Sequence, residues 1–174
     1  MLRGATSPDD LYADPPPWDI GRPQPAFLAL AETGAIKGRV LDVGCGTGEH
    51  VLLASGLGLD VTGVDLAPNA LLAAEEKARD RNRTVRFLRH DARRLAELRE
   101  SFDTVLDCGL FHGFDEVDRA SYVDGLGAVH KVARNEVEDA FAGGWQVDSI
   151  EPSTIDITTD PQGIRAWLVG LTRI

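Results

Sequence analysis

Cysteine, aromatic residues and long apolar runs are all scarce in this 174-residue chain. Its two cysteines, Cys45 and Cys108, lack the spacing of a disulfide framework, so we expect reduced thiols in a cytoplasmic protein. No apolar run approaches the roughly 20 residues that cross a bilayer, and we therefore expect no membrane partner. No grouping of Cys, His, Asp or Glu has the spacing of metal ligands, so the sequence indicates no metal.

Positive charge is also in short supply. The chain carries 18 Lys and Arg against 28 Asp and Glu, a net charge of -10. Enzymes that act on nucleic acid need a cationic surface for phosphates, so no nucleic acid partner is expected. The arginines between Arg79 and Arg89 cluster, but we interpret them as a solvated helix end and strand edge. The expected substrate is a small, uncharged or weakly acidic molecule, and the expected state is a monomer or homodimer.

The order of apolar segments along the chain predicts an α/β fold. Short Val- and Leu-rich runs alternate with amphipathic segments, which is typical of parallel βαβ units in a doubly wound, mostly parallel sheet. We expect strands at 39–44, 60–65, 84–89 and 102–107, with helices near 25–34, 47–56, 68–80, 92–99 and 117–130. A helix near 135–142 and β-rich runs at 145–151 and 164–172 follow, and we expect an antiparallel C-terminal strand from them.

The N-terminal residues differ in composition from the rest. Residues 1–24 are rich in Pro and Asp, and the prolines exclude a regular helix or a central strand there. The remaining residues, 25–174, have the length of one α/β domain with its own core.

One glycine-rich turn carries most of the functional signal. The run Arg-Val-Leu-Asp-Val that starts at Arg39 leads into Gly44, Gly46 and Gly48, which predicts a buried strand, a bare-backbone turn and a helix. This arrangement brings backbone close to a nucleotide-like ligand, although any strand-to-helix turn can use glycines. A dinucleotide fingerprint of the form Gly-x-Gly-x-x-Gly would need a glycine where Glu49 stands.

Together with Asp65, which ends the next apolar run, this turn resembles the class I S-adenosylmethionine (SAM)-dependent methyltransferases. Small bacterial members related to the thiopurine, thiol, phenol and quinone methyltransferases are the most similar. The resemblance implies a Rossmann-like methyltransferase fold, with SAM as cofactor and S-adenosylhomocysteine (SAH) as product. It implies that the backbone of Gly44, Cys45 and Gly46 passes beneath the methionyl part of SAM and that Asp42 lies near its ammonium. It also implies that Asp65, with Leu66 beside it, accepts hydrogen bonds from the ribose hydroxyls.

Two further segments carry family positions. Asp91 and Ala92 follow the third strand, where the family contacts adenine, although Asp91 is equally suited to cap the next helix. After the fourth strand, the resemblance implies that Cys108 contacts SAM by its backbone, while Leu110, Phe111 and His112 border the substrate. His112 is the candidate general base at neutral pH, and its alternative is a histidine that caps a helix or lines the wall.

The proline-rich lead-in around Trp18 also resembles part of this superfamily. There the segment, residues 1–24 here, folds over the cofactor as a lid. Trp18 would then pack beside the sulfonium, because an aromatic face attracts a cation. Its alternative is to anchor a loose tail to the core.

The resemblance is interrupted once. It runs from Pro15 to Val129 and resumes from Val132 to Ile174, and the family's fifth strand has no counterpart between them. Four or five residues cannot supply a buried strand with two connections, so either the chain has a deletion of roughly twenty residues or the sequence omits a segment. With a real deletion, the last hairpin must pair directly with the fourth strand, or a second chain must fill the gap.

The sequence therefore favours methyl transfer from SAM to an oxygen, sulfur or nitrogen nucleophile of a small molecule, by in-line displacement. A non-catalytic protein that binds SAM or a nucleoside is the alternative, because of the missing strand. An NAD-dependent oxidoreductase ranks third, because Glu49 breaks the dinucleotide fingerprint.

Overall fold

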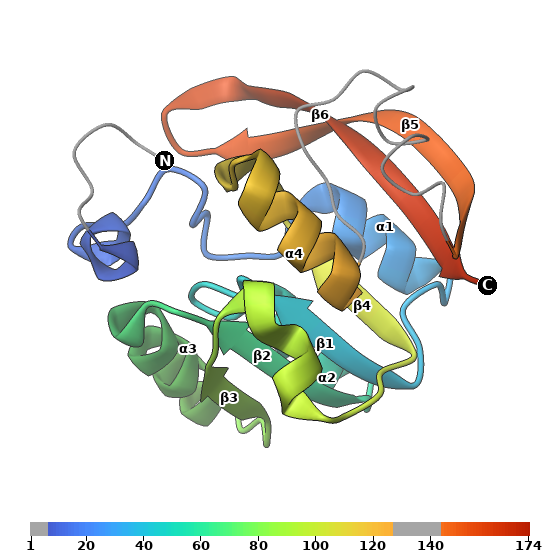
Figure 1. Cartoon of the computed structure of the whole chain (residues 1–174). Coiled ribbons are helices and arrows are strands. Elements are labelled where there is room, and N and C mark those ends of the chain that lie inside the picture. The colour runs from blue at the N-terminus through green and yellow to red at the C-terminus, as the bar shows by residue number, and fades with distance from the viewer. Residues whose placement is uncertain (1–6, 127–143) are drawn as a thin grey trace.

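A four-stranded parallel sheet forms the centre of the molecule. The computed structural model describes residues 7–126 and 144–174. Strands β1 (Arg39–Val43), β2 (Asp60–Asp65), β3 (Arg86–Arg89) and β4 (Thr104–Asp107) pair in the order β3-β2-β1-β4 (Figure 1). The predicted α/β fold with a mostly parallel sheet is confirmed.

Helices cover both faces of this sheet. They are α1 (Pro25–Glu32), α2 (Glu49–Gly56), α3 (Pro68–Asp80) and α4 (Glu116–Leu126), with 3-10 helices η1 (Pro8–Tyr12), η2 (Ala92–Leu98) and η3 (Phe111–Gly113). The regular helix that the sequence predicted at 92–99 is wrong in type. Asp91 caps a 3-10 segment there, and non-helical dihedral angles at Arg94 (φ -126°, ψ 28°) kink it. The helix expected near 135–142, and the end of the one expected at 117–130, lie outside the described residues.

The C-terminal part is one long hairpin. Strands β5 (Trp145–Ile157) and β6 (Asp160–Arg173) pair antiparallel as a separate two-stranded sheet. The expected antiparallel pairing is confirmed, but the strands are longer than the runs at 145–151 and 164–172. Among the described residues β4 pairs with β1 alone, so the direct pairing of the hairpin with the fourth strand, one of the two outcomes expected for a real deletion, is not observed. The hairpin instead packs by side chains, since Ile150 joins the core of the sheet.

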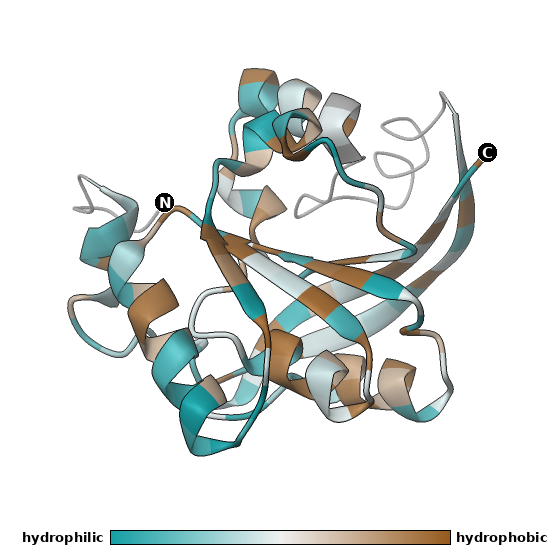
Figure 2. Cartoon of the chain, turned by 90° about the horizontal axis from the view of Figure 1, so that it is seen from below, coloured by the Kyte–Doolittle hydropathy of each residue, from teal (hydrophilic) through white to brown (hydrophobic). Residues whose placement is uncertain are grey.

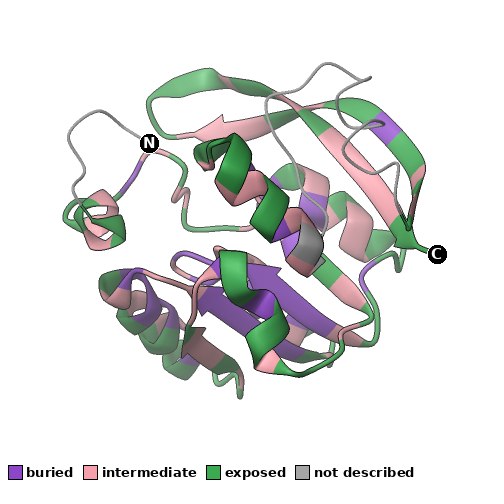
Figure 3. Cartoon of the chain, in the orientation of Figure 1, coloured by how far each residue is buried: buried purple, intermediate pink, exposed green. Residues whose placement is uncertain are grey.

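Two hydrophobic clusters hold these layers together, one on each face of β1. Leu41 and Val43 pack with η2, α4 and the hairpin, whereas Val40 packs with α1, α2 and α3. The alternation follows from the strand period of two. Figure 2 shows apolar residues along the strands, and Figure 3 shows β1 and β2 buried between the layers. A strand buried on both faces is typical of parallel sheets.

Among the described residues, β3 and β4 are the two edge strands of the sheet. Val105 in β4 is 37% exposed. The gap that the sequence predicted near 130–133 lies outside the described residues. In the described ranges, no helix is both long and apolar enough to cross a membrane.

Candidate functional site

A cavity opens at the carboxyl ends of β1 and β4, the edge at which α/β sheets bind ligands. Four parts of the chain line it: the N-terminal segment, the glycine turn with the start of α2, the end of β4, and the hairpin. The lining residues are Tyr12, Trp18, Asp19, Ile20, Arg22, Gln24, Gly44, Cys45, Gly46, Thr47, Glu49, His50, Cys108 and Ile155. Five of the predicted site residues are therefore brought together here: Trp18, Gly44, Cys45, Gly46 and Cys108.

Bare backbone forms one wall of the cavity. Gly44 and Gly46 have φ angles of +67° and +52°, a left-handed conformation that strains any residue with a side chain. A Cβ on Gly46 would also come within 2.8 Å of the Tyr12 hydroxyl. The amides of Gly44 and Cys45 both donate to the Val64 carbonyl, at 2.8 and 3.0 Å, which fixes the turn on β2.

Asp42 is buried close to this turn. Its side chain is 1% exposed, and its Oδ2 atom has no hydrogen-bond partner among the described residues. Burial and, to a smaller extent, the nearby carboxylates Asp107 and Asp65 raise the pKa of Asp42 to about 8. A buried carboxyl oxygen without a partner is costly, and a cation beside it would stabilise the charged form of the group.

Asp65 connects the end of β2 to the glycine turn. Its two carboxylate oxygens accept from the amides of Gly46 and Ala67, each at 2.9 Å. Burial raises the pKa of Asp65, and these two amides oppose that effect. Asp65 and Leu66 do not line the cavity. The ribose contact stays a prediction, but Asp65 holds the cavity wall in place.

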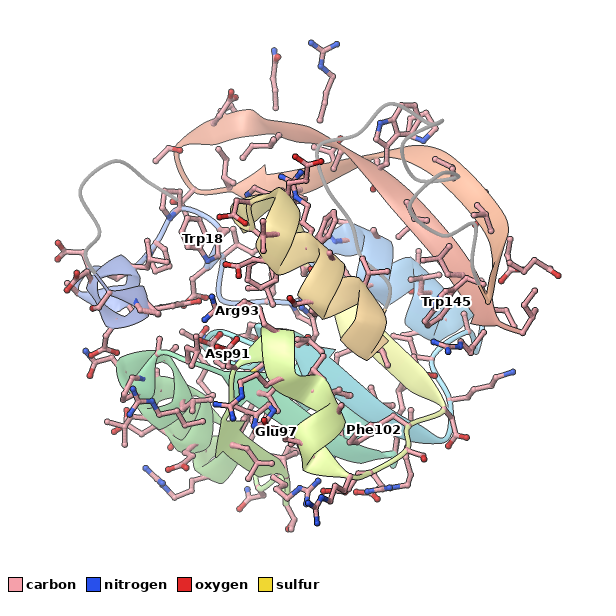
Figure 4. The ribbon with its side chains drawn as sticks, viewed as in Figure 1. Trp18, Asp91, Arg93, Glu97, Phe102 and Trp145 are labelled. Carbon is pink, nitrogen blue, oxygen red and sulfur yellow. The ribbon has the colours of Figure 1, made fainter. Side chains whose placement is uncertain are left out.

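Asp91 caps the helical segment that follows it, which was the alternative to its predicted contact with adenine. Its carboxylate accepts from the Arg93 amide at 3.0 Å and pairs with the Arg93 guanidinium at 2.6 Å (Figure 4). The hydrogen bonds from Arg93 lower the pKa of Asp91. Ala92 is buried, and neither residue lines the cavity. Their predicted contact with adenine stays a prediction.

Both cysteines lie in the cavity wall as neutral thiols. Burial raises the pKa of Cys108 to about 12 and the pKa of Cys45 well above its usual value. Because the thiolate is the reactive form, these two side chains are poor nucleophiles at neutral pH.

The turn after β4 separates the predicted substrate residues. Phe111 is 4% exposed and packs in the core against Tyr122, so its ring does not line the cavity. His112 is exposed, and its ring lies over Gly109, because a Cβ there would meet His112 Cε1 at 3.3 Å. The same Cβ would meet Ile155 at 4.0 Å. His112 is therefore close to the rim of the cavity, whereas Phe111 supports the turn from inside.

The N-terminal segment is tied to the cavity wall by a lysine. Lys77 of α3 pairs with Asp19 at 3.4 Å and with Glu49 at 2.9 Å, and donates to the Thr47 hydroxyl at 2.7 Å. Thr47 donates in turn to Asp19 at 2.9 Å. Glu49, the residue that breaks the dinucleotide fingerprint, thus belongs to an ion-pair network. Trp18, which precedes Asp19 in the chain, is 37% exposed and lines the cavity (Figure 4).

The same segment is also bound to the hairpin. The Gln24 side chain donates to the Asp156 carbonyl at 3.0 Å and accepts from the Asp156 amide at 2.7 Å. Arg22 pairs with the Asp156 carboxylate at 2.7 Å, and the Thr158 amide donates to the Pro17 carbonyl at 2.7 Å. Residues 17–24 therefore bridge the glycine turn and the hairpin across the cavity.

His50 is a cavity residue that the sequence did not indicate. Its Nε2 atom accepts from the Gln24 amide at 3.2 Å, and its ring lies 4.2 Å from that of Phe27. Burial lowers the pKa of His50 to about 4, so the ring is neutral at neutral pH. Its position in the first turn of the helix that follows the glycines was a usable signal. Tyr12 and Ile155 had no such signal.

The described part of the chain contains no cluster of side chains suited to bind a metal ion. No group of three or more His, Cys, Asp or Glu side chains there could hold an ion.

Comparison with known proteins identifies the family. Residues 40–133 match the model of a methyltransferase domain, and the chain belongs to this family. It is 30% identical to 2-heptyl-1-hydroxyquinolin-4(1H)-one methyltransferase of Mycobacteroides abscessus, over 86% of this chain and 76% of that one. It is 33% identical to probable thiol methyltransferase 2 of Arabidopsis thaliana, over 57% of this chain and 45% of that one.

A solved structure is also similar over almost the whole chain. It is described as the conversion of a disulfide bond into a thioacetal group during echinomycin biosynthesis, and it superposes with a TM-score of 0.85 at 34% identity. The match covers 95% of this chain and 91% of that one. The chain is thus a class I SAM-dependent methyltransferase, and its cofactor is SAM. The oxidoreductase alternative has no support.

Proposed function

We propose that this protein transfers the methyl group of SAM to an oxygen, sulfur or nitrogen atom of a small organic molecule, at the cavity beside Cys108 and His112. The observation that carries this proposal is the cavity itself. A glycine wall without side chains lines it at the carboxyl ends of β1 and β4. Asp42, in the strand that leads into this wall, is buried outside the cavity lining, and its Oδ2 atom has no hydrogen-bond partner among the described residues.

The residues present fit SAM. Its ammonium and sulfonium are cations, which suits the buried Asp42 and the aromatic face of Trp18. Its methionyl part would lie along the Gly44–Gly46 backbone. Asp65 would accept from the ribose hydroxyls with Leu66 beside it, and Asp91 and Ala92 would contact adenine.

Bound SAM supplies a methyl group on a sulfur that leaves without protonation. The protein then has to position the acceptor and exclude water. The segment 17–24 serves the second need as a lid, since it bridges the cavity. His112 removes the proton of a hydroxyl acceptor, whereas an acidic thiol needs no base. The neutral thiols of Cys45 and Cys108 do not compete for the methyl group.

The relatives support a small acceptor with oxygen or sulfur chemistry. One is named for a hydroxyquinolone, one as a probable thiol methyltransferase, and one solved relative is described by the conversion of a disulfide into a thioacetal. The last is 34% identical and covers 95% of this chain, which favours a sulfur or oxygen acceptor over nitrogen.

A second candidate is binding of SAM or a nucleoside without catalysis. The lack of a fifth strand in the sequence favours it, because β4 pairs with β1 alone among the described residues. Binding and turnover distinguish the two candidates.

The test combines titration calorimetry and turnover. SAM and SAH should bind and NAD should not, and SAM should be converted to SAH with at least one member of a panel of thiols, phenols and quinols. Binding without turnover across the panel would favour the second candidate. Preference for NAD would refute both.

Asp65→Ala links the cavity to the ligand. It removes a charged acceptor worth about 1.5–3 kcal/mol, so the Kd for SAM should rise about 10- to 150-fold. Asp60→Ala is the matched control, because Asp60 begins the same strand and is exposed. An unchanged Kd in a folded Asp65→Ala protein removes Asp65 from the site.

A further inference from the structure

The strand β4 ends in a buried carboxylate that organises the turn after it. Asp107 accepts from the Leu110 amide through Oδ1 at 2.8 Å, and the backbone amides of Gly109 and Phe111 also stabilise its charge. One carboxylate thus gathers the amides of a turn in which Gly109 has a φ of +86°. The conformation of residues 108–112 depends on where this carboxylate points.

A tyrosine from α4 determines that direction. The Tyr122 hydroxyl donates to Asp107 Oδ2 at 2.8 Å, so the two oxygens of Asp107 have different partners. Tyr122 is 1% exposed, and its ring lies 6.0 Å from the ring of Phe111 and 5.3 Å from that of Phe114. The ring therefore contacts Phe111 in the turn and Phe114 just after it, while the hydroxyl binds Asp107, the residue before the turn.

The turn itself carries residues of the proposed reaction. Cys108 lines the cavity, and the ring of His112 lies over Gly109 near Ile155 of the hairpin. A small rotation of the Asp107 carboxyl group would release the Leu110 amide and move Cys108 and His112 together.

We propose that Tyr122 is a positioning residue that acts through Asp107 to fix the 108–112 turn, and with it the acceptor side of the cavity. The effect on turnover rests on the proposed function. The effect on the turn does not.

The charge of Asp107 gives this role a signature. Burial raises the pKa of Asp107 to about 6 even though the hydrogen bond from Tyr122 favours the charged form. The other titratable groups near it are Asp42 of β1 and Cys108, and burial keeps both of them protonated at pH 7. Without the Tyr122 hydroxyl, the pKa of Asp107 must rise further, so the acceptor of the turn amides becomes neutral closer to pH 7.

Tyr122→Phe tests the inference, because it keeps the ring and removes only the hydroxyl. Ser121→Ala is the matched control: it removes a hydroxyl from the same helix, where Ser121 is exposed and bonds only to the Val117 carbonyl among the described residues. Asp107→Asn, alone and combined with Tyr122→Phe, completes a double-mutant cycle.

Two measurements are made on all of these proteins. The first is hydrogen exchange of the Leu110 amide, with the Leu41 amide of β1 as internal reference. Tyr122→Phe should accelerate exchange at Leu110 by about 10- to 100-fold and leave Leu41 unchanged. The second is turnover between pH 5 and 8. The kcat should fall about 10-fold or more while the KM for SAM changes less than about threefold, and the acid limb of the profile should move to higher pH.

The cycle separates a role through Asp107 from simple core packing. In the Asp107→Asn background, Tyr122→Phe should add less than about twofold to either readout. Additive effects, or equal acceleration at Leu110 and Leu41, would refute the inference. If no acceptor is turned over, the proposed function fails while the exchange cycle still decides the role of Tyr122.

Discussion

Replacing Asp42 with asparagine should change how the stability of the ligand-free protein depends on pH. Asp42 is buried, and burial together with Asp107 and Asp65 raises its pKa to about 8. In the unfolded chain an aspartate titrates near pH 4, at about 3.9. A carboxyl group whose folded pKa is raised contributes stability that is complete below the unfolded pKa. That contribution is lost as the pH rises through the folded pKa.

The size of the loss follows from this difference. Between pH 6 and 7.5 the unfolded Asp42 is ionised and the folded one is still largely protonated. A difference of one bound proton changes the free energy of unfolding by about 1.4 kcal/mol per pH unit, so about 2 kcal/mol is lost across this window. Asp107, whose pKa is raised to about 6, contributes in the same direction mainly below the window. It remains present in the Asp42→Asn variant.

Urea unfolding at pH 6.0, 6.75 and 7.5 and constant ionic strength measures this difference. The Asp42→Asn protein should gain about 2 kcal/mol relative to the native sequence across the series. Asp60→Asn is the control, because Asp60 is exposed and should leave the two curves parallel. If the free energy of unfolding depended on pH equally in Asp42→Asn and in the native sequence, the buried carboxyl group would already be ionised. The argument that Asp42 favours a cation from the ligand would then fail.

Two further predictions concern the lid and the proposed base. Lys77→Met removes the cation shared by Asp19 and Glu49, so SAM should dissociate about 10-fold faster in stopped-flow measurements. Arg79→Met on the exposed side of α3 should not change the rate, and equal rates for both variants would exclude the lysine from closing the cavity. His112→Ala should lower the rate about 10²–10⁴-fold for a hydroxyl acceptor of high pKa and little for an ionised thiol. Equal losses for both acceptors would assign His112 to the wall.

Much of the fold could be predicted because its signals are local. The run from Arg39 into three glycines predicted β1 and the turn, and the alternation of apolar segments predicted the parallel sheet. The sequence predicted a regular helix after Asp91, but helical periodicity does not reveal the ion pair between Asp91 and Arg93 that accompanies the 3-10 segment there. Arg93 folds back on Asp91 two residues away, and Arg94 leaves the helical region.

The sequence predicted those cavity residues that lie in or next to a recognisable motif, and it missed those that only tertiary packing brings to the cavity. The glycine turn and Cys108 lie where strand ends predict them. Tyr12 and Ile155 reach the cavity only through tertiary packing, and no pattern in their neighbourhood marks them. Phe111 shows the opposite case: it stands in the predicted segment, but its ring packs against Tyr122, and its contact with the substrate stays a prediction.

The bridge between Gln24 and Asp156 has a consequence for synthesis of the chain. These residues are 132 positions apart. At about 5–20 residues per second, a ribosome needs about 7–26 s to make the second partner after the first. During that interval residues 17–24 lie beside a sheet in which some strand edges still lack a partner. The five prolines from Pro15 to Pro25 withhold amide donors, so this segment cannot enter that sheet as a strand.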